Sequence, residues 1–373
     1  MAMASAKSTS IKSNQRRNAI LINLLLVFIC FAWTIPTFGL LVSSFRLRDD
    51  IAKSGWWSVL PHREWRKTAD LAIPAGLDRN KPMTIEGVTA TFEAFRAGVE
   101  TSSGTRLRWL GNRRTGKLEV QEQRWMVNWD FTTENYNSVL TGQRYRVKMA
   151  DGTEKEELGE DIGRSFLNTA TVSIPATVIP ILIAAFAAYA FAWLKFPLKR
   201  VLFAGIVALL VVPLQAAMIP MLRDFKGLGI TGTFMGVWLA HTTFGLPLAT
   251  YLLYNYISQL PRETLEAAFM DGASPFTTFT RLILPLSVPA LASFAIFQFM
   301  WVWNDYLVSL IFLGGAPAVR VMTMRLADMV GTRGQDWHLL TSGAFITMLV
   351  PLIVFFSLQR YFVRGLLAGS VKG

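Results

Sequence analysis

Long runs of residues without a charged side chain constrain the fold of this chain more than any other feature. A helix needs about 20 residues to cross the roughly 30 Å of hydrocarbon in a bilayer, and six runs reach that length. They contain no Lys, Arg, Asp, Glu or His apart from His241 and Asp305. We therefore predict an all-α membrane protein with six transmembrane helices. The runs are 18–45, 165–194, 201–222, 227–261, 282–312 and 339–359.

Charged residues are concentrated in one segment between the first and second runs. Residues 46–161 hold 19 of the 37 Lys and Arg residues and 18 of the 25 Asp and Glu residues. The net charge of +12 therefore arises in tails and short loops, which is where membrane proteins place positive charge, and it does not indicate a nucleic-acid surface. The single cysteine, Cys30, excludes a disulfide within the chain, and three scattered histidines do not suggest a metal site. We predict no metal, no cofactor and no catalytic residue.

Basic residues also predict the orientation. With the N-terminus in the cytoplasm, the cytoplasmic loops and tails carry twelve Lys and Arg residues and the short outer loops carry five. The first run is longer than the 7–15-residue core of a signal peptide, so we expect it to be retained. The predicted segments are a cytoplasmic tail (1–18), a first transmembrane helix (19–45), a periplasmic insert (46–161), a core with five transmembrane helices (162–361, including the cytoplasmic loop 258–284) and a cytoplasmic tail (362–373).

The predicted insert has the pattern of a small β-rich domain at about 80–130. Residues 84–92 alternate loosely, and 117–121 and 124–127 also have strand character. Residues 111–117 fit the spacing GxxxxGK of a phosphate-binding loop, but Leu118 stands where that loop needs Ser or Thr to bind magnesium. We interpret 111–117 as a basic hairpin turn.

The loop 258–284 has the pattern of a slim helix suited to insertion in a groove on another protein. Pro261 suits a helix start, Glu263 is favourable in the first turn, and Gly272 permits a left-handed cap. Ala267 and Ala268 keep the helix thin, and Glu266 supplies a carboxylate. A second helix is expected to follow and to run to Pro285.

The same loop resembles a known family. The pattern EAA-x3-G-x9-I-x-LP is the signature of ABC importer permeases, and this chain has Leu282 at the isoleucine position and matches at Glu266, Ala267, Ala268, Gly272, Leu284 and Pro285. The segment 303–306, Trp-Asn-Asp-Tyr, resembles one found in carbohydrate importers of the maltose type, and the tail 365–373 resembles the C-terminus of their second permease. That permease lacks an insert at 46–130, and among such proteins the insert most resembles that of α-glucoside importers.

The resemblance implies a permease subunit of an ATP-driven sugar importer in the bacterial inner membrane, working by alternating access. It implies a second homologous permease, two ATPase subunits and a periplasmic sugar-binding protein as partners, with ATP hydrolysis on the ATPases. Glu266, Ala267, Ala268, Asp271, Gly272, Leu284 and Pro285 would couple this chain to an ATPase.

Polar residues within the runs are candidates for the translocation path. They are Gln298, Trp301, Asn304, Asp305 and His241. Asp305 follows Pro285 by 20 residues, or about 30 Å of helix, which would place it in the outer half of the membrane. A buried carboxylate has two interpretations, a residue of the sugar path or a structural group capped by backbone or arginine. A different class of protein, a proton-coupled secondary transporter using Asp305 and His241, would need a longer relay and would leave the 266–285 pattern unexplained.

Overall fold

The computed structural model describes residues 2–74, 77–142, 144–148, 154–158, 162–333 and 336–367. The chain divides into two compact units, a helical unit (1–48 and 132–373) and an inserted unit (49–131). The inserted unit is thus shorter than the predicted periplasmic segment 46–161. Of the predicted tail 362–373, residues 362–367 continue the helix Trp337–Leu367, and residues 368–373 lie outside the described residues.

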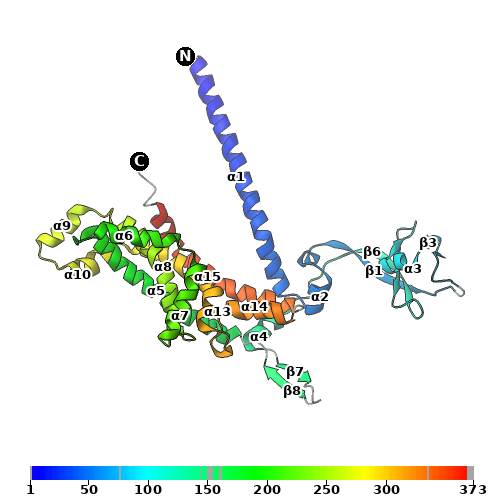
Figure 1. Ribbon diagram of the computed structural model, residues 1–373. Coiled ribbons are helices and arrows are strands. Elements are labelled where there is room, and N and C mark those ends of the chain that lie inside the picture. The colour runs from blue at the N-terminus through cyan, green and yellow to red at the C-terminus, as the bar shows by residue number, and fades with distance from the viewer. Residues whose placement is uncertain are drawn as a thin grey trace. The chain divides into compact units, whose positions relative to one another are not determined.

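The helical unit is a bundle of long helices joined by short ones (Figure 1). Its helices are α1 (Ala2–Ser44), α4 (Glu134–Thr141), α5 (Ile162–Trp193), α6 (Lys199–Ala208), α7 (Leu214–Gly227), α8 (Phe234–Ile257), α9 (Arg262–Met270), α10 (Pro275–Thr278), α11 (Leu284–Leu286), α12 (Val288–Trp303), α13 (Leu307–Leu313), α14 (Met322–Arg333) and α15 (Trp337–Leu367). Short 3-10 turns lie at Leu209–Val211 and Pro317–Val319, a π-helical turn lies at Phe279–Ile283, and strands β7 (Arg144–Lys148) and β8 (Glu154–Leu158) pair antiparallel.

Within the described residues, three helices are long and apolar enough to span a bilayer, and up to five if each bent pair forms one span. The three are Arg16–Ser44, Ile162–Trp193 and Trp337–Tyr361. At 24 residues α8 is also long enough, although it is not among these three. The described residues therefore form a mostly helical membrane protein, while six spans stay a prediction.

Two of the predicted spans are bent. The helices Lys199–Val211 and Leu214–Gly227 meet at 107°, at Val212 and Pro213, where proline cannot donate the next helical hydrogen bond. The helices Pro275–Leu286 and Val288–Trp303 meet at 73°. The straight 30 Å helix expected between Pro285 and Asp305 is therefore wrong, because α12 ends at Trp303 after 16 residues.

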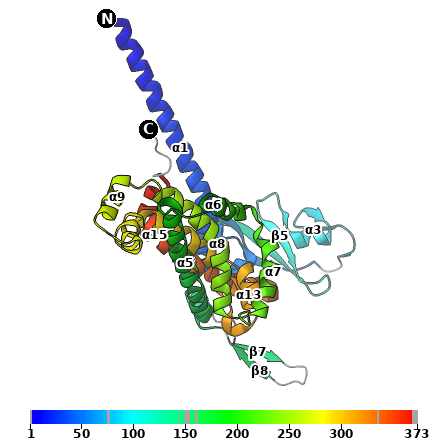
Figure 2. The same ribbon diagram turned by 60° about the vertical axis from the view of Figure 1, so that its left-hand side comes forward.

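The first span is attached to the bundle chiefly at its end. Its surface from Arg16 to Phe31 is exposed throughout, and both views show it running away from the other helices (Figure 2). At Ser44 the helix is bonded to the rest of the bundle. The Asn135 amide donates to the Ser44 and Arg46 carbonyls, each at 2.9 Å, and the hydroxyls of Ser44 and Tyr136 lie 2.6 Å apart. Burial raises the pKa of Tyr136 above its usual value, so this phenol stays neutral.

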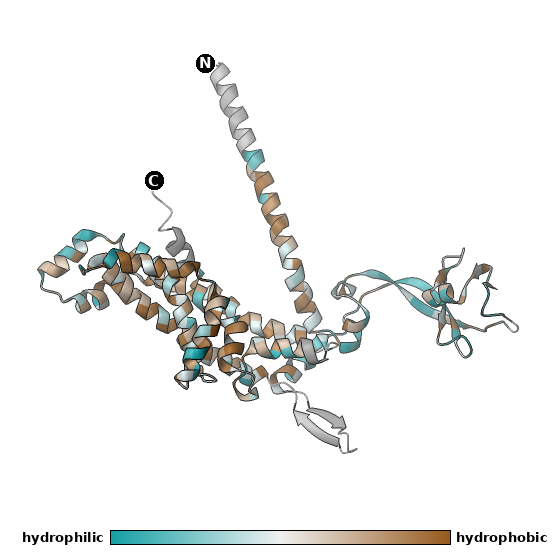
Figure 3. Ribbon diagram, in the orientation of Figure 1, coloured by the Kyte–Doolittle hydropathy of each residue, from teal (hydrophilic) through white to brown (hydrophobic). Residues whose placement is uncertain are grey.

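The inserted unit is built on one antiparallel sheet of order β1–β6–β5–β4 and a small hairpin, β2–β3. Its elements are α2 (Arg48–Lys53), a 3-10 turn (Trp56–Val59), β1 (His62–Leu71), β2 (Met83–Ile85), β3 (Val88–Ala90), α3 (Phe92–Ala97), β4 (Val99–Glu100), β5 (Arg106–Leu110) and β6 (Lys117–Met126). Seven buried side chains form its core: Met83, Ile85, Phe92, Phe95, Leu107, Trp109 and Leu118. Polar colouring along β1 and β6 contrasts with the apolar middle of α1 (Figure 3).

The predicted β-rich insert is confirmed, with differences in detail. Residues 84–92 form a hairpin rather than one strand, because Glu86 (φ 48°) and Gly87 (φ 76°) turn the chain. Residues 117–126 form one continuous strand, and 111–116 form the hairpin turn predicted for the GxxxxGK segment. The sheet also begins earlier than expected, because β1 pairs with β6 from His62 onward.

The bundle core lies where α5, α8 and α12 pack together. One cluster of buried side chains joins α5 and α8 to the 258–286 loop through Tyr189, Leu253, Leu265, Phe279 and Ile283. A second cluster joins α5, α7, α8, α12 and α13. Motion of the loop is thus connected by direct packing to three long helices.

Candidate functional site

The loop helix α9 forms as its sequence indicates and ends in a well-defined cap. Gly272 has φ +77°, its N–H donates to the Phe269 carbonyl (3.1 Å), and the Ala273 N–H donates to the Ala268 carbonyl (3.0 Å). This pair of bonds is a Schellman cap, which glycine allows without steric strain. A Cβ at Gly272 would meet no atom within 4 Å, so the requirement for glycine comes from its backbone conformation.

Most of α9 is exposed, and one side chain anchors it. Leu265 is 1% exposed and packs into the core cluster that contains Phe279 and Ile283. Glu266, Ala267, Asp271 and Gly272 are exposed and Ala268 is half-buried. The Glu266 carboxylate pairs with Arg262 one turn earlier, at 2.8 Å, and both side chains stay largely in solvent.

Large apolar side chains accompany this exposed helix. Met270 is 82% exposed and Phe276, at the start of α10, is 66% exposed. Helices α9 and α10 lie at the end of the bundle away from α4 (Figure 1). Exposed apolar groups on a projecting loop are typical of a surface that contacts another protein or a membrane.

The second half of the pattern connects this surface to the bundle. Leu284 is half-buried and Pro285 is exposed in α11, directly after the π-helical turn. Phe279 in that turn contacts the rings of Phe186 and Tyr189 on α5, with centroids 5.0 and 5.6 Å apart. The Tyr256 hydroxyl on α8 donates to the Leu286 carbonyl at 3.2 Å.

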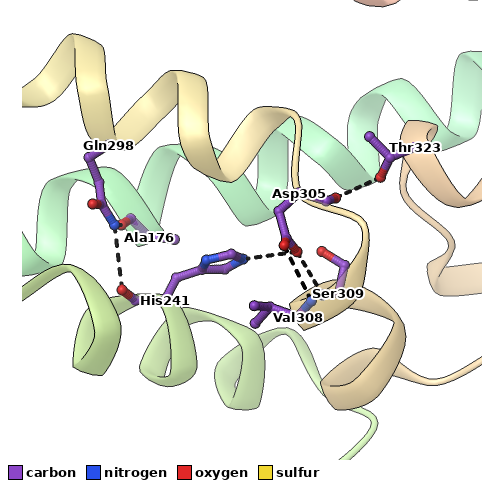
Figure 4. Close-up of polar contacts among 7 residues, drawn as sticks. All are labelled: Ala176, His241, Gln298, Asp305, Val308, Ser309 and Thr323. Carbon is purple, nitrogen blue, oxygen red and sulfur yellow. Dashed lines mark hydrogen bonds and ion pairs between the residues drawn. The ribbon is translucent and has the colours of Figure 1, made fainter. Parts of the chain in front are cut away.

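A separate polar cluster lies inside the bundle (Figure 4). Oδ2 of Asp305 lies 3.6 Å from Nε2 of His241, and the two side chains are 8% and 0% exposed. The Asp305 carboxylate accepts hydrogen bonds from the N–H groups of Val308 (3.3 Å) and Ser309 (2.9 Å), so it caps the first turn of α13. Its carbonyl accepts from the Thr323 hydroxyl at 2.6 Å.

Gln298 connects the other side of the cluster. Its amide donates to the carbonyls of Ala176 on α5 (3.1 Å) and His241 on α8 (3.4 Å). A Cβ added at Gly245 would lie 2.6 Å from the Gln298 amide oxygen, so glycine permits this close approach. The Trp301 ring meets the His241 ring edge to face at 5.1 Å. Asn304 lies apart, exposed, with its amide bonded to the Met300 carbonyl of its own helix at 2.8 Å.

Gln298 and Trp301 also border a cavity of about 310 Å³ beside the break between α6 and α7. Apolar side chains supply most of its wall, and Thr243 and Gln298 supply polar groups. The other lining residues are Leu209, Leu210, Val212, Leu214, Ala217, Met221, Phe244, Gly245, Pro247 and Leu248.

Of the predicted path residues, the structure brings together His241, Gln298, Trp301 and Asp305 and leaves Asn304 outside. The sequence analysis missed Ala176, Gly245 and Thr323. Ala176 and Asp305 contribute backbone carbonyls, which carry no residue-specific signal. A glycine directly before an apolar stretch in a span is too common to single out Gly245.

A bent-helix bundle with a projecting capped helix and a polar cluster at its centre is the architecture of a membrane transport permease. Residues 180–367 match the family described as the inner membrane component of binding-protein-dependent transport systems, and the chain belongs to that family of ABC importer permeases. The resemblance seen in its sequence is confirmed.

Two relatives match nearly the whole chain. The osmoprotective compounds uptake permease protein GgtD of Synechocystis sp. is 45% identical over 351 residues, covering 94% of this chain and 91% of the relative. The alpha-glucoside transport system permease protein AglG of Rhizobium meliloti is 46% identical over 389 residues, covering 94% and 97%. Such coverage leaves about 22 of the 373 residues unmatched, so most of the inserted unit is shared with both relatives.

The fold is also similar to one in a crystal structure of a bacterial ABC transporter involved in the import of the acidic polysaccharide alginate. The TM-score is 0.51 at 19% identity, covering 64% of this chain and 82% of the other. At this identity the likeness supports the fold alone.

Proposed function

We propose that this chain is one of two permease subunits in an ATP-driven importer of α-glucosides or related small glycosides. The observation that carries the proposal is the match over 94% of the chain to two uptake permeases, one of them for α-glucosides. Both matches include most of the inserted unit, which the maltose-type second permease lacks. The partners would be a second permease, two ATPase subunits and a solute-binding protein.

The surface built from Glu266, Ala267, Asp271 and Gly272 would be the contact with an ATPase subunit. Its helix is slim, exposed and capped, and Leu265 with Phe279 provides direct packing from that contact to α5 and α8. Closure of the ATPases would then move the long helices as rigid bodies in alternating access. The chain performs no bond chemistry of its own in this proposal.

We also propose that the chain has six spans and cytoplasmic termini. The inserted unit would then lie on the outer side of the inner membrane. The basic-residue bias supports this orientation, and α8, enclosed by α5 and α12, supplies the sixth span. The cavity beside Gln298 and Trp301 would contribute to the path, because an aromatic ring with a neighbouring amide suits a sugar.

The rival, a proton-coupled transporter using Asp305 and His241, is not favoured. Asp305 is held by two backbone N–H groups, which is an arrangement that fixes a helix end, and His241 lies 3.6 Å away, beyond hydrogen-bond distance. A relay would need further ionisable groups, and no other acidic residue occurs in the predicted spans.

One reconstitution separates the two. The chain is assembled with its partner permease and ATPases in proteoliposomes, and uptake of radiolabelled trehalose, sucrose and maltose is measured with the binding protein outside. We expect accumulation that requires enclosed ATP and persists without a proton gradient. Accumulation that requires the proton gradient and is independent of ATP would support a proton-coupled transporter.

A further inference from the structure

The inserted unit carries a hollow whose rim is rich in arginine. The hollow has a volume of about 600 Å³ and lies where α3 packs beside β5 and the turn 111–116. Its lining includes Arg96 from α3, Arg108 from β5 and Arg113 from the turn, around Phe92 and Trp109.

The floor of the hollow is rigid. Trp109 is fully buried, its indole N–H donates to the Asn112 carbonyl (3.1 Å), and its ring meets Phe92 edge to face at 5.5 Å. The Asn112 side-chain oxygen accepts from the N–H groups of Arg114 (3.0 Å) and Thr115 (2.7 Å), which fixes the turn. A fixed turn and a packed floor keep the backbone around the hollow in one conformation before anything binds.

The residues that line the hollow include three arginines and no acidic residue, and the surrounding segment is also basic. Residues 77–117 contain eight Lys and Arg residues and four Asp and Glu residues. Arg113 lies over the Phe92 ring (4.7 Å) and pairs with Glu93 at 3.3 Å. In the part of the chain that the structure describes, neither Arg96 nor Arg108 forms an ion pair, and both are exposed.

We propose that this hollow is a docking site for an acidic surface of the solute-binding protein, a proposal that rests on the proposed function and on the outer location of the inserted unit. Guanidinium groups bind carboxylates through two parallel hydrogen bonds, and a positive patch steers an acidic partner toward it. A single small anion would gain little from exposed arginines, because each keeps its water and salt screens the attraction. A protein face with several carboxylates can engage all the rim arginines together.

The test uses the complete transporter in nanodiscs and its purified solute-binding protein. The variant R96E/R108E is compared with the control K53E/R66E, which makes the same change in charge at exposed side chains of the inserted unit that do not line the hollow. We expect R96E/R108E to weaken binding of the binding protein at least about tenfold and to abolish its stimulation of ATP hydrolysis. Unstimulated ATP hydrolysis and the control should match wild type. The milder R96Q/R108Q should fall between them.

Three further results are informative. Raising salt from about 0.1 M to about 0.5 M should weaken wild-type binding strongly and variant binding little. Binding of R96E/R108E within twofold of wild type would overturn the docking site. The docking site would also be overturned if citrate bound at the hollow and the substitutions left the affinity for the binding protein unchanged. The hollow would then be a small-anion site. If the wild-type transporter neither bound the binding protein nor increased its ATP hydrolysis in its presence, the proposed function would be overturned instead.

Discussion

His241 on α8 and Asp305 after α12 face each other across the bundle interior, with Nε2 and Oδ2 3.6 Å apart and both side chains almost fully buried. The separation is longer than a hydrogen bond, and no hydrogen-bond partner of either His241 nitrogen is found among the described residues. The carboxylate is held by the first turn of α13, while the Gly232 N–H before α8 donates to the Phe312 carbonyl of that helix (2.8 Å). The short α13 therefore has its first turn capped beside His241 and its last turn bonded to the segment just before α8.

This arrangement predicts that Asp305 stabilises the fold of the bundle by capping α13 and does not contact the sugar. Asp305→Ala removes the cap of α13, at a cost of about 0.5–2 kcal/mol, and leaves two N–H groups without an acceptor. We expect less assembled complex to be recovered, measured by size-exclusion chromatography, with uptake falling in the same proportion. Asn304→Ala is the control, since Asn304 is exposed and bonded only within its helix. Full recovery of Asp305→Ala complex with lost uptake would instead indicate a role in the sugar path.

Gly245 and Gln298 give a prediction about packing. In Gly245→Ala the new Cβ would lie 2.6 Å from the Gln298 amide oxygen, so the amide must move away from the carbonyls of Ala176 and His241. Loss of these bonds should cost about 1–3 kcal/mol, because buried polar groups are left unpaired. We expect a lower melting temperature of the purified complex in detergent. Gly205→Ala in α6 has open space around its Cβ and should melt at or above the wild-type temperature. Equal melting of both variants would show that the α8–α12 contact tolerates the extra methyl group.

The orientation can be tested by labelling. In a Cys30→Ser background, the exposed positions Ser102 and Ser258 are each replaced by cysteine. An impermeant maleimide added to cells with a permeabilised outer membrane should label Ser102→Cys and leave Ser258→Cys unlabelled until the inner membrane is opened. Labelling with the opposite sidedness would reverse the assigned orientation.

The sequence predicted those features that depend on local chemistry. Uncharged runs located the long helices, and Pro261 and Gly272 predicted the start and cap of α9, because proline and glycine act through their own backbone conformations. Features that depend on distant partners were missed. The pairing of β1 with β6 joins segments about 55 residues apart, and His62–Leu71 is too polar to suggest a strand. Pro213 breaks its run by 107°, whereas other prolines in the spans stay within continuous helices: Pro175, Pro180, Pro247 and Pro351.

The polar cluster likewise contains residues that the sequence could identify and contacts that it could not. Asp305 and His241 attracted attention as rare ionisable groups in apolar runs, and the structure does place them together. The Asp305 carboxylate accepts hydrogen bonds from the backbone N–H groups of Val308 and Ser309, and backbone groups are identical in every residue. Only a three-dimensional arrangement could therefore distinguish a helix cap from a relay.

The proposed contact with the ATPase gives the sharpest prediction. Glu266→Lys places two positive charges at i and i+4 on α9, which costs only about 0.2–0.5 kcal/mol, so Leu265 should keep the helix docked. Gly272→Val places a β-branched residue at φ +77°, at a cost of about 1–2 kcal/mol, and should redirect the chain after α9. We expect each variant to enter the membrane in normal amounts, to lose uptake, and to co-purify with less ATPase or lose substrate-stimulated ATP hydrolysis.

Two controls separate a contact from simple damage. Gly229→Val imposes the same kind of backbone strain (φ +71°) in the open loop between α7 and α8, and Asp224→Lys reverses an exposed helical carboxylate in that region. Both should retain ATPase binding and uptake, because neither residue belongs to the exposed surface of α9 and α10. If Glu266→Lys and Gly272→Val transport as well as these controls and keep a fully coupled ATPase, the helix Arg262–Met270 is not the coupling element. The ATPase would then have to contact a different cytoplasmic segment of this chain.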